Sequence, residues 1–322
     1  MFKDEYSGLL LIGDPHIEAR QPGFRKDNFA ETVLGKIRWC LEVCENESLL
    51  PVFLGDLFDK PRGNPNWLIS RLIEIMSVTP SIGIYGNHDC ADVELDENDS
   101  LSILIAAGCL RLVSELDPFR TRVHQRDVII GGSSYRAPIP TTFHLPKRRA
   151  QGLFDNDPFV LWLTHHDIGF PGYDNNRIDP HQISNVELLV NGHIHRPLES
   201  VKAGRTLWMT PGNITRRSRS EAVRDHVPAV TRIDVMPEDY KISTIEVPHA
   251  PFDEVFHELV VEENEEREQS NFVTGLAELN SRKTESGAGL HQFLSENVEQ
   301  FDVPVADVIM QLAQEVTNVE TE

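Results

Sequence analysis

Five short segments of the sequence place Asp, Asn and His side chains directly after apolar runs. They are Asp14-Pro15-His16, Gly55-Asp56-Leu57-Phe58-Asp59, Gly86-Asn87-His88-Asp89, Thr164-His165-His166-Asp167 and Asn191-Gly192-His193-Ile194-His195. Carboxylate oxygens, an amide oxygen and imidazole nitrogens form a mixed ligand set that suits divalent transition metals. The set is large enough for two ions, and paired ions are used to displace phosphate esters. These residues therefore predict a two-metal hydrolytic site.

The elements that must position these residues can be read from the spacing of apolar side chains. Residues 8–12, 52–54 and 82–85 are short apolar runs typical of buried strands, and 27–45 and 65–78 have helical spacing. Asn64 before Pro65 predicts the start of the second helix. The alternation predicts a parallel sheet with helices on its faces, and such sheets place their sites at the carboxyl ends of strands. Further short strands are expected at 128–130, 160–163, 187–190, 206–209, 230–235 and 241–247.

The ordered series of segments resembles the calcineurin-like metallophosphoesterase superfamily. The blocks of that superfamily are Asp-x-His, Gly-Asp-x-x-Asp, Gly-Asn-His followed by Asp or Glu, a strand-end His, and Gly-His-x-His, and all five occur here between residues 14 and 195. Ile129-Ile130-Gly131-Gly132 leading to Tyr135, and Pro211-Gly212-Asn213, are similar to the SbcD-type DNA repair nuclease subunits. The resemblance implies an α/β fold, a sandwich of two mixed β-sheets flanked by helices.

The resemblance also implies a role for each residue of the series. One metal ion would be held by Asp14, His16 and His195, the other by Asn87, His165 and His193, and Asp56 would bridge the two. His165 is preferred over His166 because it comes first after the strand. His88 would protonate the leaving oxygen, and Asp89 would hold the His88 ring. Asp59 and Asp167 are expected to orient imidazoles or to shape turns, since carboxylates commonly hold metal-bound histidines.

The implied activity is that of a di-metal phosphodiesterase, an SbcD-like exonuclease or endonuclease subunit acting on DNA in repair or recombination. Manganese is the metal expected first, with iron, zinc, nickel or magnesium as alternatives. The expected partners are DNA, an SbcC-type coiled-coil ATPase and a second copy of the chain in a homodimer. A second hypothesis keeps the site but changes the substrate to a phosphomonoester, a cyclic nucleotide or a phosphoprotein. A third is an acidic interaction subunit whose metal site is structural.

Other enzyme classes fail on particular residues. Ile130-Gly131-Gly132-Ser133-Ser134-Tyr135 resembles a serine nucleophile turn, but Tyr135 stands where that motif requires glycine. No Gly-x-x-x-x-Gly-Lys-Ser/Thr segment occurs, so an ATPase would have to be a separate subunit. Two basic clusters, which include Arg136 and Arg216, supply candidate phosphate contacts. Surface pairing of Arg216 with Glu221 is the alternative.

Composition and charge limit the class of protein. The chain has 322 residues and a net charge of -21, which argues against a freely diffusing DNA-binding protein. No apolar run approaches the ~20 residues of a membrane span, and the start of the chain lacks the features of a secretory signal, so the cytoplasm is the expected location. Four cysteines form no zinc pattern.

A change of composition near residue 250 predicts a domain boundary. Residues 251–322 carry 17 acidic and three basic side chains. We expect a catalytic domain over residues 1–250 and an acidic, mainly helical extension over 251–322. Short amphipathic helices at 271–279, 290–301 and 305–316 would form a cap on the core or bind a partner. The short extension puts DNA gripping by this part of the chain in doubt.

Overall fold

A computed structural model describes residues 2–22, 24–145, 158–173, 177–217, 219 and 221–257 of the chain. The chain divides into two units, Met1–His257 and Glu258–Glu322, and the description below concerns the first. The C-terminal helices that the sequence predicts lie outside the described residues. None of the helices in the described residues could span a membrane.

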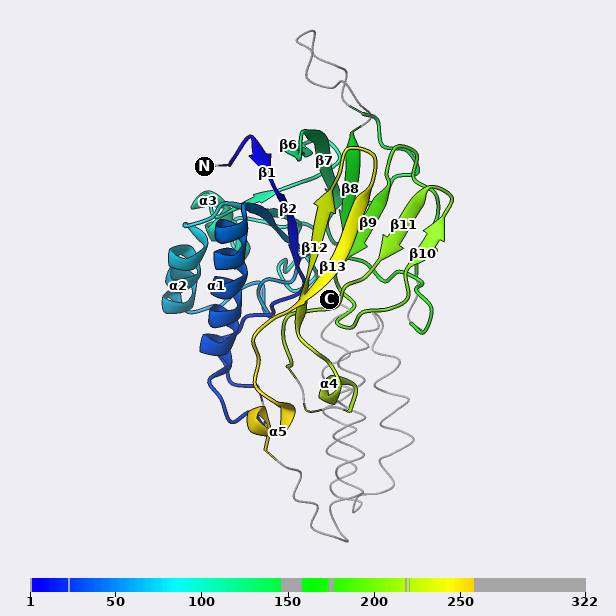
Figure 1. The fold of residues 1–322 in the computed structure, drawn as a ribbon. Coiled ribbons are helices and arrows are strands. Elements are labelled where there is room, and N and C mark those ends of the chain that lie inside the picture. Colours follow the sequence, from blue (N-terminus) through cyan, green and yellow to red (C-terminus); the bar gives the residue numbers. More distant parts are fainter. Residues whose placement is uncertain are drawn as a thin grey trace, which may run out of the picture. The chain divides into compact units, whose positions relative to one another are not determined.

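Two mixed β-sheets face each other in the first unit (Figure 1). The six-stranded sheet has the order β13 (Tyr240–Glu246), β12 (Ala229–Val235), β2 (Gly8–Ile12), β3 (Leu49–Phe53), β4 (Ser81–Gly83) and β5 (Leu110–Leu112). The strands β2 to β5 are parallel to one another, whereas β12 is antiparallel to both of its neighbours. The parallel strands match the alternation of strands and helices in the first third of the sequence.

The second sheet has seven strands. Its order is β1 (Glu5–Tyr6), β6 (Phe119–Val123), β7 (Arg126–Ser133), β8 (Phe159–Thr164), β9 (Leu188–Asn191), β11 (Thr206–Met209) and β10 (Val201–Ala203). The central strands β7, β8, β9 and β11 are parallel. The pairs β6–β7 and β10–β11 are antiparallel. The sequence analysis did not predict β1, β5, β6 or β10.

The core follows from the alternation of side chains along the strands. In β2, Leu9 and Leu11 pack in the cluster between the sheets, whereas Leu10 and Ile12 pack in the cluster with the helices. The helices α1 (Phe29–Glu47), α2 (Asn66–Met76) and α3 (Ser100–Ala106) cover the outer side of the six-stranded sheet (Figure 1). The expected fold class, a sandwich of two mixed sheets flanked by helices, is confirmed.

The helix ends show one correction to the sequence analysis. The cap of α1 is Asn28, whose side chain accepts from the backbone N–H of Glu31. The cap of α2 is Pro65 rather than Asn64. The Asn64 side chain instead donates to the carbonyl of Lys60 and to the hydroxyl of Ser100. Asn64 therefore ties the loop before α2 to the start of α3.

The first unit ends beyond the boundary that the composition suggests. The short helices α4 (Glu221–Arg224) and α5 (Phe252–Val255) follow the last parallel strand and the last hairpin, respectively. Phe256 lies under the Arg25 guanidinium, 5.1 Å from its ring centre, and Lys26 donates to the carbonyl of Asp253. These contacts tie residues 252–256 to the segment that precedes α1.

Candidate metal centre

The five polar segments converge at the carboxyl ends of strands from both sheets. Asp14 and His16 follow β2, Asp56 follows β3, and Asn87 and His88 follow β4. From the seven-stranded sheet, His165 follows β8, and His193 and His195 follow β9. Chain segments up to about 180 residues apart in sequence thus meet at one place, as their common position after strands predicts.

Four of these residues adopt left-handed backbone conformations. The φ angles are +36° at Asp14, +47° at His16, +48° at Asp56 and +68° at His193. Non-glycine residues rarely adopt this region, and such strain persists where the surrounding structure enforces it, often at functional sites. The tight turns aim these side chains inward instead of letting them alternate along a strand.

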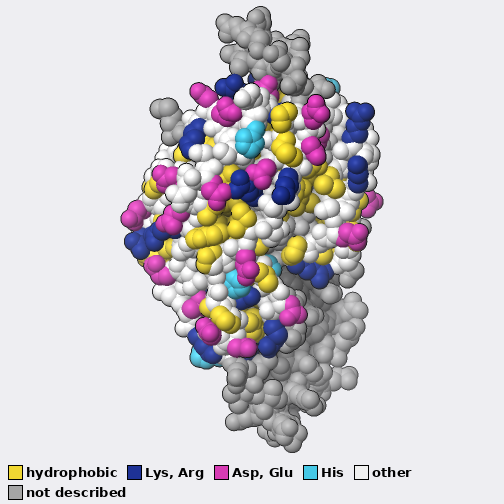
Figure 2. Space-filling model, viewed as in Figure 1, with side chains coloured by type: hydrophobic (Ala, Val, Ile, Leu, Met, Phe, Trp, Pro, Cys, Tyr) yellow, Lys and Arg dark blue, Asp and Glu magenta, His cyan; other side chains and the backbone are white. Residues whose placement is uncertain are grey.

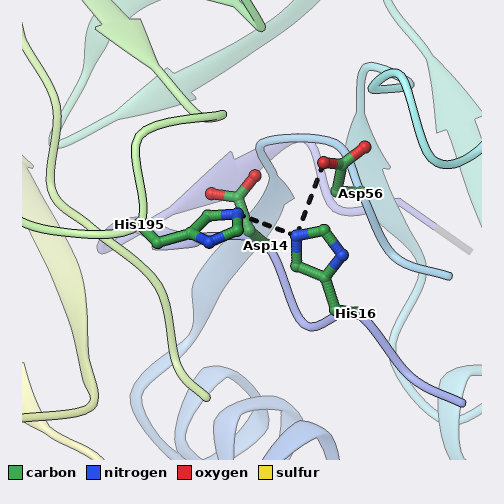
Figure 3. Close-up of side chains that lie close together, drawn as sticks. All are labelled: Asp14, His16, Asp56 and His195. Atoms are coloured by element: carbon green, nitrogen blue, oxygen red, sulfur yellow. Dashed lines mark hydrogen bonds and ion pairs between the residues drawn. The ribbon is translucent and has the colours of Figure 1, made fainter. Parts of the chain in front are cut away.

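One group of possible ligands consists of Asp14, His16, Asp56 and His195, whose ligand atoms all lie within 4.8 Å of one another. Figure 3 shows the four side chains pointing toward a common centre. The Nε2 atoms of His16 and His195 are 2.8 Å apart, and His16 Nε2 lies 3.5 Å from Asp56 Oδ2. Three of the residues are buried, and His195 forms the exposed edge.

A second group consists of Asp56, His165 and His193. His165 Nε2 lies 3.1 Å from Asp56 Oδ2. The amide oxygen of Asn87 lies 3.1 Å from His193 Nδ1, so Asn87 borders this group. Asp56 is the residue that both groups share, which is the position a bridging carboxylate requires.

Several buried ligand atoms lack a hydrogen-bond partner in the described part of the chain. Among them are Asp14 Oδ2 and His165 Nε2, both in fully buried side chains. The Nδ1 atom of His165 donates to the carbonyl of Leu54 over 2.8 Å, so its Nε2 presents a lone pair. Buried polar atoms are normally satisfied. These orphaned lone pairs fit metal ions.

The charges of the cluster also favour cations. Burial, and then the neighbouring Asp56 carboxylate, raises the pKa of Asp14 well above its ordinary value. Burial acts the same way on Asp56, but the His165 and His16 rings hold the pKa of Asp56 well below its ordinary value. Burial lowers the pKa of His16, so this ring is neutral and able to coordinate.

Comparison with known proteins gives the family. A family model described as calcineurin-like phosphoesterase matches residues 8–197, which is more than half of the chain and spans every residue of the two groups. The chain belongs to the calcineurin-like phosphoesterase family. It is thus a metal-dependent phosphoesterase, and the Asp and His cluster is the group of side chains that could hold its metal. A search of curated proteins finds no match.

Solved structures that resemble this phosphoesterase are distant in sequence. A hypothetical protein from Thermus thermophilus is 12% identical with a TM-score of 0.41, covering 75% of this chain and 100% of its own. A purple acid phosphatase from yellow lupin is 13% identical with a TM-score of 0.43, covering 76% and 52%. A dimetal phosphatase from Danio rerio is 10% identical with a TM-score of 0.42, covering 76% and 99%.

Carboxylates behind the imidazoles of the phosphoesterase orient their rings. Asp167 Oδ1 forms a hydrogen bond of 3.0 Å with His193 Nε2, whereas Asp59 Oδ1 lies 3.4 Å from His16 Nδ1 without hydrogen-bond geometry. A ring nitrogen that faces a carboxylate carries the proton and leaves the other nitrogen for the metal. The expectation that Asp59 and Asp167 orient imidazoles or shape turns matches these contacts.

His88 lies at the exposed rim of the centre. Its side chain is 36% exposed, and its ring packs edge-on against the His16 ring at 4.7 Å. The Nδ1 atom donates to the Asp59 carbonyl over 2.8 Å. His88 is in neither of the two groups that share Asp56, as expected for a proton donor, although it belongs to a separate cluster with His16 and Asp59.

The expected role of Asp89 is wrong. Its buried carboxylate accepts from the backbone N–H groups of Gly86, Leu57 and Phe58, at 3.0, 3.3 and 3.0 Å. The residue beside the His88 ring is instead Asp59. Asp89 therefore joins the loop after β3 to the loop after β4, and so holds Asp56 and His88 in register.

The structure also shows which of the adjacent residues His165 and His166 lies in the ligand cluster. His166 takes part in none of the metal-capable groups found among the described residues. Its Nδ1 accepts from the backbone N–H of His165, and its own N–H donates to Asn191 Oδ1. His165, the first residue after β8, is the one in the cluster.

The two arginines proposed as phosphate contacts have different surroundings. Arg136 is exposed and stacks over the Tyr135 ring. Arg216 is buried, and its guanidinium donates to the carbonyls of His226 and Ala250, so the alternative of a surface residue does not describe it. The arginine at the centre is Arg217, 2.6 Å from Asp59 Oδ1. Sequence reasoning missed it, although it belongs to the same basic cluster as Arg216.

Proposed function

We propose that this phosphoesterase hydrolyses phosphodiester bonds of DNA, as the nuclease subunit of an SbcD-type complex. The observation that carries the proposal is His88, a partly exposed imidazole beside the candidate metal ligands but outside the two groups that share Asp56. A phosphodiester in DNA releases an alkoxide, which needs a proton. The sequence similarity around Tyr135 and Asn213 to the SbcD-type subunits supports DNA as the substrate.

The residues of the chain divide the work. Asp14, His16, Asp56 and His195 would hold one ion, and Asp56, Asn87, His165 and His193 the other. When bound, two ions lower the pKa of a water and offset the charge that builds on the phosphoryl oxygens. Manganese is the metal we propose from the resemblance to the SbcD-type subunits; the mixed oxygen and nitrogen set suits divalent transition metals in general.

His88 would supply the proton to the leaving oxygen. Because Nδ1 faces the Asp59 carbonyl and keeps its hydrogen, Nε2 is the atom that gives up the proton. Asp59 also approaches His16 and Arg217. Asp59 therefore contacts the proposed proton donor through its backbone carbonyl, and a candidate metal ligand and a guanidinium through its carboxylate.

The charge distribution supports a division of DNA binding and DNA hydrolysis between two subunits. On the face in Figure 2, basic side chains lie among acidic ones, and the coloured residues form no continuous basic surface. Phosphate contacts by Lys and Arg dominate the affinity of DNA-binding proteins. We therefore propose that a separate ATPase subunit of the SbcC type supplies most of the DNA affinity, and this chain the hydrolysis.

The net charge of -21 favours one alternative, a phosphoesterase for small or protein-borne phosphates. Such an enzyme needs no basic surface, and the metal centre would serve it equally well. A purely structural metal site is disfavoured, since a structural centre needs no exposed proton donor at its rim.

The test compares two substrates on the full chain with manganese. We expect degradation of linear duplex or single-stranded DNA that stops on chelation, and a loss of a hundredfold to ten-thousandfold in His88→Ala. The same variant should keep much more of its activity on bis-p-nitrophenyl phosphate, whose leaving group needs no proton. His124→Ala, which changes a histidine beside Val235, is the matched control.

The opposite results are equally clear. Hydrolysis of phosphomonoesters with DNA left intact, even after addition of the ATPase subunit, would favour the alternative. Equal losses on both esters with loss of metal would make His88 a ligand.

A further inference from the structure

A cavity of about 420 Å³ with an unusual charge lies beside α1. Three basic residues line it, Arg25, Lys36 and Arg216, and each residue is only 8% exposed. Asp27, His249 and Glu254 also line the cavity. None of these residues belongs to the metal centre.

The charges in this cavity do not balance. Arg25 pairs with Asp27 through two hydrogen bonds, of 2.8 and 2.7 Å. Neither Lys36 nor Arg216 forms an ion pair with any described residue; Lys36 Nζ donates to the carbonyl of Ile214 over 2.7 Å, and Arg216 donates to two carbonyls. Buried charges are normally paired, because an uncompensated one is strongly destabilising. Two cationic groups at one cavity wall therefore have no direct ion-pair partner among the described residues.

The electrostatics of Lys36 agree with this reading. Burial, and then the nearby Arg216 and Arg25 guanidinium groups, lower the pKa of Lys36 to about 7. Burial and Arg25 also lower the pKa of Arg216, while Glu246 acts in the opposite direction. An anion among these groups would remove their mutual repulsion.

We propose that this cavity binds a small oxyanion of the phosphate or sulfate class, free or as the phosphate of a small organic molecule, between Lys36 and Arg216. Lys and Arg groups are the usual donors to such anions. The low exposure of the three basic side chains excludes a DNA strand, whose backbone carries sugars on both sides of each phosphate. The volume leaves room for a small organic group beside one phosphate. The site does not depend on the proposed nuclease function.

The cavity and the metal centre share one chain segment. The carbonyl of Ile214 accepts a hydrogen bond from Lys36 Nζ. The N–H of Ile214 donates to the carbonyl of Gly13, the residue before Asp14. Arg216 reaches the cavity, and the next residue, Arg217, reaches Asp59. An anion bound in the cavity would therefore also restrain residues 214–217, which contact the loop of the metal centre.

The test uses sulfate, a dianion that does not titrate near neutral pH, and the full metal-loaded chain. Sulfate replaces chloride at constant ionic strength while calorimetry and thermal unfolding are followed. We expect binding and a raised unfolding temperature in the wild type and in the control Lys202→Met, which changes an exposed lysine on β10. Lys36→Met should weaken the cavity site by tenfold or more, whereas any sulfate at the metal centre would act alike in all three proteins.

Equal sulfate binding in the three proteins would overturn the proposal. Diffraction from crystals soaked in selenate gives a second measurement that needs no variant. An anomalous peak within hydrogen-bond distance of Lys36 Nζ is expected, and its absence from an accessible cavity would contradict the proposal. Ribose 5-phosphate distinguishes the sources: tighter binding than inorganic phosphate identifies an organic phosphate, and equal binding identifies the free ion.

Discussion

The metal centre leaves no room for side-chain atoms at Gly86. A Cβ atom there would lie 2.2 Å from Asp56 Oδ1 and 2.6 Å from His165 Nε2. Real Cβ atoms do not approach other atoms so closely, so Asp56 or the backbone would have to move. The glycine of the Gly-Asn-His-Asp segment is thus part of the cradle that holds the shared carboxylate.

Gly86→Ala should therefore damage the centre more than the fold. We expect loss of bound metal and a fall in phosphoesterase activity of about a hundredfold or more, since displacement by an ångström is enough for that. Elemental analysis and a turnover assay on one preparation would measure both.

The matched control is Gly35→Ala in α1. A Cβ at Gly35 meets nothing within 4 Å, so this variant should keep its metal and gain about 0.5–1 kcal/mol in free energy of unfolding. Full metal content in Gly86→Ala would contradict the steric argument.

Spacing in the sequence predicts which residues meet, but not all of their contacts. Two ligands that share a segment, such as His193 and His195, can be found from their spacing and their place after a strand. The roles of Asp59, Asp89 and Arg217 depend on loops that are distant in sequence and meet only in the fold. Residue types alone cannot separate Asp89, which binds three backbone N–H groups, from Asp59.

At the scale of elements, apolar runs located most of the buried strands. The runs at 8–12, 160–163 and 230–235 correspond to β2, β8 and β12. β1 and β5 have two and three residues, too few to show a period. β6 does alternate between buried and exposed residues. Its exposed positions are arginines, so its sequence contains no continuous apolar run.

The buried lysine in α1 makes stability depend on pH. Lys36 lies on the buried face of α1 among Val33, Ile37 and Cys40, and its pKa of about 7 is far below the ordinary value of 10.5. Below pH 7 Lys36 is protonated in both the folded and the unfolded state. The folded state then bears the full cost of burying this charge, which lowers the free energy of unfolding by on the order of 5 kcal/mol. Between pH 7 and 10 the unfolded state binds more protons, so stability rises with pH.

Lys36→Met removes this dependence. We expect the unfolding temperature of the variant to exceed that of the wild type most at pH 6. The difference should become smaller as the pH rises to 10. The lost hydrogen bond to Ile214 is the same at every pH and does not change the slope. Thermal unfolding in chloride buffers measures it; parallel curves for the two proteins would show that Lys36 does not titrate in this range.

At the scale of the whole molecule, the metal centre joins the two sheets. Asp14 and Asp56 come from loops of the six-stranded sheet, and His165 and His193 from loops of the seven-stranded sheet. Without cations, the carboxylates of Asp14 and Asp56 are buried close together with no metal ion to offset their charge. Ligands that bind only the folded state stabilise it.

Removal of metal should therefore lower the unfolding temperature of the whole first unit. Differential scanning calorimetry before and after chelation, followed by re-addition of manganese, measures the effect and its reversal. An unchanged transition would mean that the ions do not tie the sheets together.

The alternation of strands and helices predicts the parallel strands of the six-stranded sheet, whereas the sandwich of two sheets and the ligand assignment follow only from the resemblance to the superfamily. The substrate is not predicted by the residue pattern, because it depends on surfaces and on a partner that spacing does not reveal. Charge is informative only in part: it argues against strong DNA affinity of this chain alone, and both phosphoesterase hypotheses agree with that.

The most direct test of the account is the metal content of Asp56→Asn. Asp56 is the residue common to both ligand groups, so its loss should weaken both ions, whereas His195→Ala should weaken one. Elemental analysis after dialysis should give two ions per chain in the wild type, about one in His195→Ala and less than one in Asp56→Asn. Two ions retained in Asp56→Asn would contradict a shared, bridging carboxylate and with it the two-metal centre described above.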